Sequence, residues 1–187
     1  IFRENISDLE AAGIYVASSN SSDYVDIIDC HFVNNTGKNY AGGCIASAGE
    51  IKIQSSIIDS NLADGGSAGG MFIGYANKVE VINTQFRYNE ADGGAAGAIY
   101  FYENDSIFIS SSNISYNNAN NNTSGGIILD GTNDYVNFSN TNIVANEGNV
   151  GGMQCYADEL IMNYCRIDSN ISSGSAGGLL LNSDNVQ

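Results

Sequence analysis

The most constraining feature of this 187-residue sequence is a pattern that recurs every 24 to 30 residues. Each copy places apolar residues at its positions 1, 3 and 8, a small residue at position 6 and asparagine at position 11. A second motif lies between the copies: a small residue, one or two glycines, and an apolar-x-apolar triplet, as in AGGMFI from Ala68. Both motifs have the two-residue period of a strand and lack the spacing of a helix. A repeat of this length predicts a solenoid with several short strands per repeat.

About 27 residues with two or three strands match one coil of a right-handed parallel β-helix, whose coils stack at roughly 4.8 Å. Leucine-rich repeats would include a helical segment, and propeller blades need about 40 residues. The 22 glycines and the absence of proline favour unbroken strands joined by left-handed turns. We therefore predict an all-β fold of six to seven coils. They form one β-helix segment, 1–187, and are expected to span 6–35, 36–61, 62–89, 90–117, 118–146, 147–170 and, in part, 171–187.

Both ends of the sequence fall within a coil and have no polar cap, which a free solenoid requires. We therefore expect this segment to belong to a longer solenoid or to a continuous assembly.

The asparagines that end the copies are expected to stack as a column. Stacked side-chain amides hydrogen-bond along such a column, and asparagine tolerates the left-handed conformation that closes a turn. We interpret the column as structural; the alternative is a line of polar groups that binds a ligand. The predicted ladder comprises Asn35, Asn61, Asn89, Asn117, Asn146 and Asn170, and Asn5 would begin it.

The net charge is −15 at pH 7, with only six lysines and arginines. Such a charge repels the phosphates of nucleic acids and the surface of anionic membranes. No apolar run reaches the length of a membrane span. We expect no nucleic-acid partner and no membrane insertion of this segment.

The four cysteines do not have the spacing of a metal site. Disulfides joining Cys30 to Cys44 and Cys155 to Cys165 would link residues within about one coil of each other. The alternative is four thiols that fill the core as small apolar groups. The sequence leaves both alternatives open.

Nine Asn-x-Ser/Thr sequons are present, where about four would arise by chance. The two on ladder positions, Asn5 and Asn170, are expected to stay bare if the ladder is buried. The other seven lie in expected loops or at outward positions, and N-linked glycans there would indicate a eukaryotic secretory route. These glycosylation candidates are Asn20, Asn34, Asn104, Asn113, Asn121, Asn122 and Asn137.

Polysaccharide lyases and hydrolases use this architecture, and their chemistry requires clustered carboxylates, with a basic partner in the lyases. The outward column that would carry such groups is charged only in its first coils, which favours a salt-bridge ladder over an active site. Asp64 and Asp92 precede Gly-Gly pairs as ordinary turn residues, so calcium is not expected. We predict no catalytic residue, no metal and no cofactor. The charged column comprises Asp26, Lys52, Glu80, Phe108, Asn137 and Ile161.

A second outward column is apolar and aromatic. A stripe of this length, about 30 Å over the stacked coils, is unusual on the exposed face of a monomer. It would form a lateral interface or a platform on which sugar rings stack; the alternative is that strand-favouring residues simply pack along their own column. The stripe comprises Tyr15, Ile45, Phe72, Tyr100, Ile128 and Leu180, with Gln154 before the last.

The paired signatures GGCI, GGMF, GAIY, GGII, GGMQ, GGLL and FVNN, FRYN resemble the GGA[ILV] and FxxN repeats of the chlamydial polymorphic outer membrane proteins. The resemblance covers nearly the whole chain, with Ile in place of Phe in several copies. It implies a passenger-type β-helix exposed on a cell surface, acting as an adhesin or a structural stalk, and it implies no catalytic residues.

We therefore expect a non-enzymatic, extracellular structural or adhesive β-helix. Self-association end to end or laterally is expected, because open strand edges can add further coils, and glycans or cell-surface ligands are candidate partners. The alternative function is a carbohydrate-binding or polysaccharide-cleaving module that uses the aromatic stripe.

Overall fold

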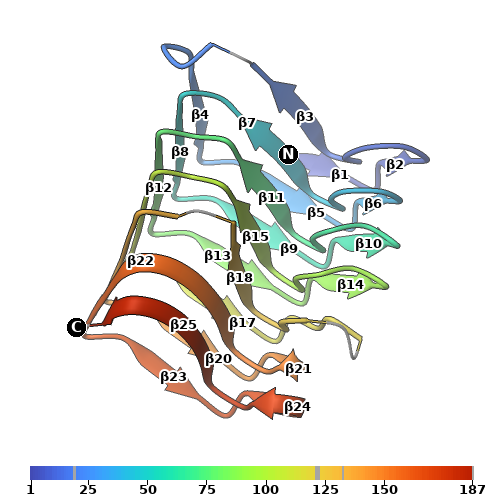
Figure 1. Ribbon diagram of the computed structural model, residues 1–187. Coiled ribbons are helices and arrows are strands. Elements are labelled where there is room, and N and C mark those ends of the chain that lie inside the picture. Colours follow the sequence, from blue (N-terminus) through green and yellow to red (C-terminus); the bar gives the residue numbers. More distant parts are fainter. Residues whose placement is uncertain (19, 121–122, 132, 187) are drawn as a thin grey trace.

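The chain folds into a parallel β-helix. The structure, a computed structural model, describes residues 1–18, 20–120, 123–131 and 133–186, except for the side chains of residues 45 and 183–186. Its described residues form strands and turns and no helix, and the parallel strands stack into a solenoid of about six turns (Figure 1). The N-terminal coil lies at one end of the stack and the C-terminal coil at the other. The predicted all-β solenoid is confirmed.

The strands that follow the small residue of the first motif form one seven-stranded face. All its pairs are parallel and keep the register of the sequence repeat, so that Phe86 lies between Ile58 and Ile114. The strands are β1 (Phe2–Arg3), β5 (His31–Val33), β9 (Ile57–Asp59), β13 (Gln85–Arg87), β17 (Asn113–Ser115), β20 (Asn142–Val144) and β23 (Arg166–Asp168).

The strands that follow the Gly-Gly motifs form a second face, which we call the aromatic face. They are β3 (Ile14–Ala17), β7 (Cys44–Ser47), β11 (Met71–Gly74), β15 (Ile99–Tyr102), β18 (Ile127–Asp130) and the first parts of β22 (Met153–Asn163) and β25 (Leu179–Val186).

The third face, which we call the charged face, contains the first strand of each copy of the repeat. It comprises β4 (Tyr24–Ile28), β8 (Glu50–Gln54), β12 (Lys78–Ile82), β16 (Ser106–Ser110), β19 (Tyr135–Ser139) and the last part of β22. In the last complete coil β22 runs across the corner without a break. Its start pairs with β18 on the aromatic face and its end pairs with β19 on the charged face.

Short strands occupy the remaining corner, at the right of Figure 1. They pair from coil to coil as two ladders, and the second contains a register shift between Gly148 and Val150. The strands are β2 (Ile6–Ser7), β6 (Thr36–Gly37), β10 (Leu62–Asp64) and β14 (Glu90–Asp92), followed by β21 (Glu147–Val150) and β24 (Ile171–Ala176).

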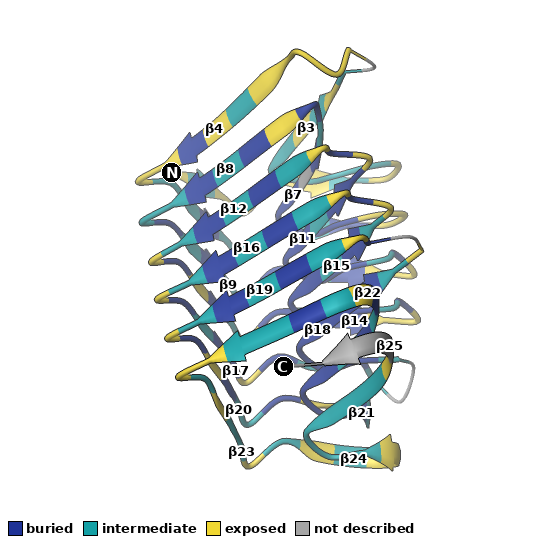
Figure 2. Cartoon of the chain, turned by 60° about the vertical axis from the view of Figure 1, so that its left-hand side comes forward, coloured by how far each residue is buried: buried dark blue, intermediate teal, exposed yellow. Residues whose placement is uncertain are grey.

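The inward side chains of the three faces make one continuous apolar core. Buried residues alternate with partly exposed ones along β8, β12, β16 and β19 (Figure 2). Burial of each large apolar side chain stabilises the fold by about 1.5–3 kcal/mol relative to exposure. The largest fully buried side chains include Phe32, Phe86, Phe101 and Phe138.

At the end of each copy of the repeat, the left-handed conformation falls on the residue before the ladder asparagine, not on the asparagine itself as the sequence suggested. The ladder side chain must point inward to reach the next coil, so the change of direction is made one residue earlier. These preceding residues have φ between +50° and +60°, and they are Glu4, Asn34, Ser60, Tyr88, Tyr116, Ala145 and Ser169.

The Gly-Gly pairs allow a close approach between coils. A Cβ added at Gly42 would lie 2.7 Å from the carbonyl oxygen of Gly69 in the next coil. The expected left-handed glycines are found instead at Gly65, Gly93 and Gly131. Most of the recurring glycines are therefore required by backbone spacing and not by positive φ.

Candidate functional site

The predicted asparagine ladder runs along the stack of coils from Asn5, which is exposed, to Asn170, which is half-buried. At each step the side-chain nitrogen of one asparagine donates to Oδ1 of the next at 2.8–3.0 Å. The same Oδ1 accepts the backbone N–H of the preceding asparagine, and each nitrogen from Asn35 onward also donates to a strand carbonyl of an earlier coil. Asn35, Asn61, Asn89, Asn117 and Asn146 are buried. These amides bond one another, which is the structural role expected of the column.

A second buried ladder overturns one glycosylation candidate. Asn104, expected in a loop, is fully buried at the corner between the aromatic and charged faces. Its Oδ1 accepts the backbone N–H of Ala76 at 3.1 Å, and its own N–H donates to Oδ1 of Asn133 at 3.2 Å. Its Nδ2 donates to the carbonyl of Ile73 at 3.3 Å. The nitrogen that would carry a glycan therefore points into the protein, and Asn104 is not an accessible sequon.

The remaining sequon candidates differ in exposure. Asn20 and Asn34 are exposed. Asn113 and Asn137 are half-buried, and their Nδ2 atoms donate to the hydroxyls of Ser115 and Tyr135. The candidates Asn121 and Asn122 lie outside the described residues.

All four cysteines are described, and all four are free thiols. The disulfides considered from the sequence are therefore not formed, and the alternative of unpaired thiols is what the structure contains. Cys44 and Cys155 are buried, and burial raises the pKa of each thiol to about 12, with a further contribution from Cys30 at Cys44. These two thiols act as small apolar groups of the core.

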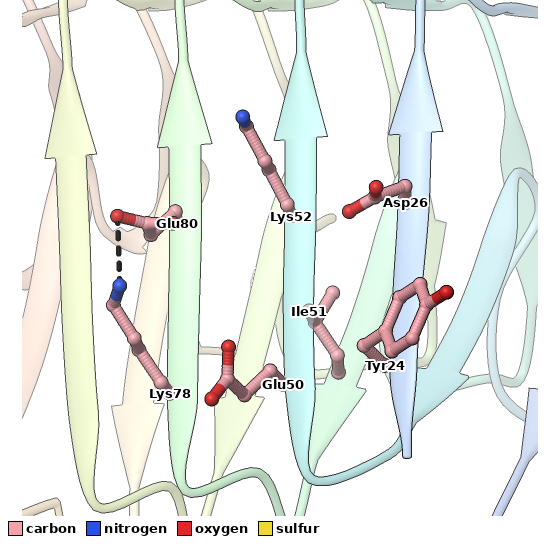
Figure 3. Close-up of a pocket in the computed structure, with 7 residues that line it drawn as sticks. All are labelled: Tyr24, Asp26, Glu50, Ile51, Lys52, Lys78 and Glu80. Atoms are coloured by element: carbon pink, nitrogen blue, oxygen red, sulfur yellow. Dashed lines mark ion pairs between the residues drawn. The ribbon is translucent and has the colours of Figure 1, made fainter.

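The charged face carries a shallow hollow of about 130 Å³ across β4, β8 and β12 (Figure 3). The expected salt-bridge ladder between coils is not formed there. The ion pair instead joins Lys78 to Glu80 of the same strand at 3.0 Å, and Lys78 also lies 5.9 Å from the ring centre of Phe108. Lys52 forms no ion pair within the described residues, although Asp26 and Glu80 lie at the paired positions of the two adjacent strands.

The predicted aromatic stripe is only partly exposed. Tyr15 is 56% exposed, whereas Ile128 is 2% exposed and does not belong to an outer surface. Ile128 pairs with Tyr100 on one side and Gln154 on the other, and these longer side chains flank it. The stripe residues Phe72, Tyr100 and Leu180 are half-buried, and the side chain of Ile45 lies outside the described part of the structure.

A run of five aromatic rings extends the stripe sideways across the aromatic face. Phe72 lies 5.8 Å from Tyr40 and 5.4 Å from Tyr100 between ring centres, with interplanar angles of 70° and 88°. Tyr102 continues the run, 6.1 Å from Tyr100 and 5.4 Å from Tyr75. We call Tyr40, Phe72, Tyr75, Tyr100 and Tyr102 the aromatic run. Edge-to-face contacts of this kind are worth about 0.5–1.5 kcal/mol each beyond area burial.

The middle ring of the aromatic run is fixed by a polar contact. The Tyr100 hydroxyl donates to Asp130 at 2.8 Å. Burial, followed by this hydrogen bond, raises the pKa of Tyr100 well above its usual range. The ring is thereby held in a defined orientation on the face.

A groove of about 240 Å³ opens beside the aromatic run. Its lining combines tyrosines with small residues and one carboxylate, and comprises Glu10, Tyr15, Ala17, Tyr40, Ser47, Phe72 and Tyr75. Tyr75 also borders another hollow of about 130 Å³, which we call the polar hollow. Its other lining residues are Ser18, Asn20, Ser21, Ala48, Gly49 and Asn77.

Sequence reasoning missed three members of the aromatic run. Tyr40 precedes β7 and Tyr75 follows β11, while Tyr102 ends β15, so none belongs to the column drawn through the strand centres. The available signal was the recurrence of tyrosine just before or after the Gly-Gly triplet.

Other kinds of site are not apparent. In the part of the chain that the structure describes, no three His, Cys, Asp or Glu side chains are placed to hold a metal ion, and no helix could span a membrane. No known family, curated protein or solved structure matched this chain.

Proposed function

We propose that this chain is a non-enzymatic structural and adhesive β-helix of an extracellular or cell-surface protein, and that it contacts its partner through the aromatic face. The observation that carries the proposal is the aromatic run, whose rings lie on an outward face of a regular solenoid. Tyr40 and Tyr75 are 43% and 60% exposed. Exposed aromatic surface of this kind is typical of interaction sites, where tyrosine supplies large contact area together with a polar hydroxyl.

The regular interior supports the structural part of the proposal. The asparagine ladder and the parallel faces repeat the same hydrogen bonds in successive coils. No buried side-chain nitrogen or oxygen among the described residues lacks a hydrogen-bond partner. Such an interior gives a stiff support that holds surface side chains in fixed positions.

The surface location is supported by the two exposed sequons, at Asn20 and Asn34, and by the resemblance of the repeats to those of surface-exposed passenger β-helices. If the chain is exposed on a surface, the sequons favour secretion through a eukaryotic secretory route.

The proposal is tested by the adhesion of the fluorescently labelled chain to a panel of cultured cells and matrix-coated surfaces. We expect saturable binding that is lost in the double variant Tyr40→Ser/Phe72→Ser. The matched control is Tyr88→Ser/Tyr116→Ser, because these tyrosines are also exposed but lie on another corner. Circular dichroism confirms that both variants fold. Absence of saturable binding to every surface, or equal binding by the two variants, would overturn the proposal.

A further inference from the structure

We propose that the groove on the aromatic face binds an uncharged oligosaccharide that lies across Tyr75. The inference rests on the proposed adhesive function, because it names the ligand class for the same face. Sugar rings would stack in the aromatic groove, and their hydroxyls would reach the polar hollow on the far side of Tyr75.

The aromatic side of the site offers ring faces that no parallel ring covers. The rings of Tyr40 and Tyr100 lie at 70° and 88° to that of Phe72. By contrast, Tyr88 and Tyr116 stack at 12° and cover each other. The C–H groups of a sugar carry partial positive charge and are attracted by the negative face of an aromatic ring. Tyr15, Tyr40 and Tyr75 line the groove and are 56%, 43% and 60% exposed, so their rings supply the surface on which sugar rings can stack.

The polar side of the site supplies hydrogen-bonding groups at a short distance from the rings. Ser18, Ser21 and Asn77 line the polar hollow, which shares Tyr75 with the groove; Asn20 also lines it but is a glycosylation candidate and is not counted among the groups that would bind the sugar. Serine hydroxyls and asparagine amides each donate and accept, as sugar hydroxyls do. A surface that is aromatic on one side and rich in hydroxyls and amides on the other matches a sugar, which has apolar faces and a polar rim.

The size of the groove suits a short stretch of sugar chain. Its 240 Å³ lies just below the roughly 300–1,000 Å³ of enclosed small-molecule sites. We therefore expect one or two sugar units to lie in the groove, with the rest of the oligosaccharide outside it.

The charge of the site decides which oligosaccharides fit. Among the described residues that line the groove, Glu10 alone has an acidic or basic side chain, the tyrosines apart, and the whole chain has a net charge of −15. Both features repel uronic acids and sulfated sugars. A cation held by the rings and Glu10 is the competing ligand class, and a choline probe tests for it.

The position of Tyr75 allows the ring to be removed without damage to the fold. Tyr75 has φ of +61°, a conformation that glycine adopts without strain. Glycine follows the corresponding strand two coils further on, where Gly131 has φ of +77°. The substitution Tyr75→Gly should therefore leave the melting temperature unchanged or raise it.

The matched control is Tyr88→Gly. Tyr88 has φ of +55° and is 55% exposed, close to the values for Tyr75, but it lies away from the groove. The two variants make the same chemical change in the same backbone conformation, and only one removes a ring from the proposed site.

Binding is measured by isothermal titration calorimetry of the full chain. The neutral probes are soluble β-1,4-linked oligomers of glucose, mannose, xylose and N-acetylglucosamine, and the charged probes are oligogalacturonate and choline. We expect at least one neutral oligomer to bind. Tyr75→Gly should weaken that binding by about tenfold or more, which is equivalent to about 1.4 kcal/mol. Tyr88→Gly should leave the binding unchanged. Binding of choline or oligogalacturonate alone, binding of no probe, or equal binding by the two variants would overturn the inference.

The adhesion assay separates this inference from the function on which it rests. If adhesion depends on Tyr40 and Phe72 but no neutral oligosaccharide binds, the ligand class is wrong and the adhesive function stands. If adhesion itself is absent, the proposed function fails.

Discussion

Asn89 donates from its side-chain nitrogen to Oδ1 of Asn117 at 2.9 Å, although the two residues are 28 positions apart in the sequence. The same nitrogen donates to the carbonyl of Ile58, and Oδ1 of Asn89 accepts both the backbone and the side-chain N–H of Asn61. One side chain thus joins three consecutive coils. A substitution at this position should therefore destabilise the neighbouring coils as well as its own.

Replacing Asn89 by alanine should lower the free energy of unfolding by about 3–5 kcal/mol, because several buried groups lose their partners together. Urea denaturation followed by circular dichroism measures the loss. The control is Asn5→Ala at the exposed start of the ladder, where we expect a loss below about 1 kcal/mol. Equal losses in the two variants would contradict the buried network.

Replacing Ala145 by glycine should stabilise the protein by about 0.5–1 kcal/mol, the reverse of the usual effect. Ala145 has φ of +55°, where its Cβ is strained and glycine is not. The control is Ala17→Gly in β3, an exposed strand residue at which glycine should destabilise by about 0.5–1 kcal/mol. Urea midpoints of the two variants should move in opposite directions, and a shift in the same direction would refute the turn assignment.

The parts of this fold that recur in every coil were predictable from the sequence. The ladder position of Asn89 appears in six copies, so its inward direction followed from the register alone. Asn104 and Asn133 form their ladder in only two coils, and two copies do not stand out as a column. At the position of Tyr75, directly after its strand, the next two coils have Glu103 and Gly131, so the repeat shows no recurring aromatic residue there that would mark it as part of a surface. The burial of Ile128 depends on the size of its neighbours, which periodicity does not report.

Expression through a eukaryotic secretory pathway should place N-linked glycans on Asn20 and Asn34 and leave Asn104 bare. The first two are exposed, whereas the side-chain nitrogen of Asn104 is hydrogen-bonded inside the fold. Glycopeptide mass spectrometry of the folded, secreted chain measures the occupancy of each sequon. Asn34→Gln should remove one glycan, whereas Asn104→Gln should leave the glycan mass unchanged and lower stability. A glycan found on Asn104 would show that the second ladder is assigned incorrectly.

Stability should fall as the pH rises from about 9 towards 12, because Cys44 and Cys155 must stay protonated in the fold. Burial raises the pKa of both thiols from 9.0 to about 12, so the unfolded chain ionises first and is favoured progressively above pH 9. Below pH 9 both states hold the protons, and this contribution is constant. The loss reaches at most about 4 kcal/mol per thiol near pH 12.

Circular dichroism is the suitable measurement of this decline in stability, because tyrosine fluorescence changes in the same pH range. Cys44→Ala should make the decline between pH 9 and 12 shallower, whereas Cys30→Ala, at a half-exposed position, should change it less. Parallel declines in wild type and Cys44→Ala would show that the Cys44 thiol is not buried as described.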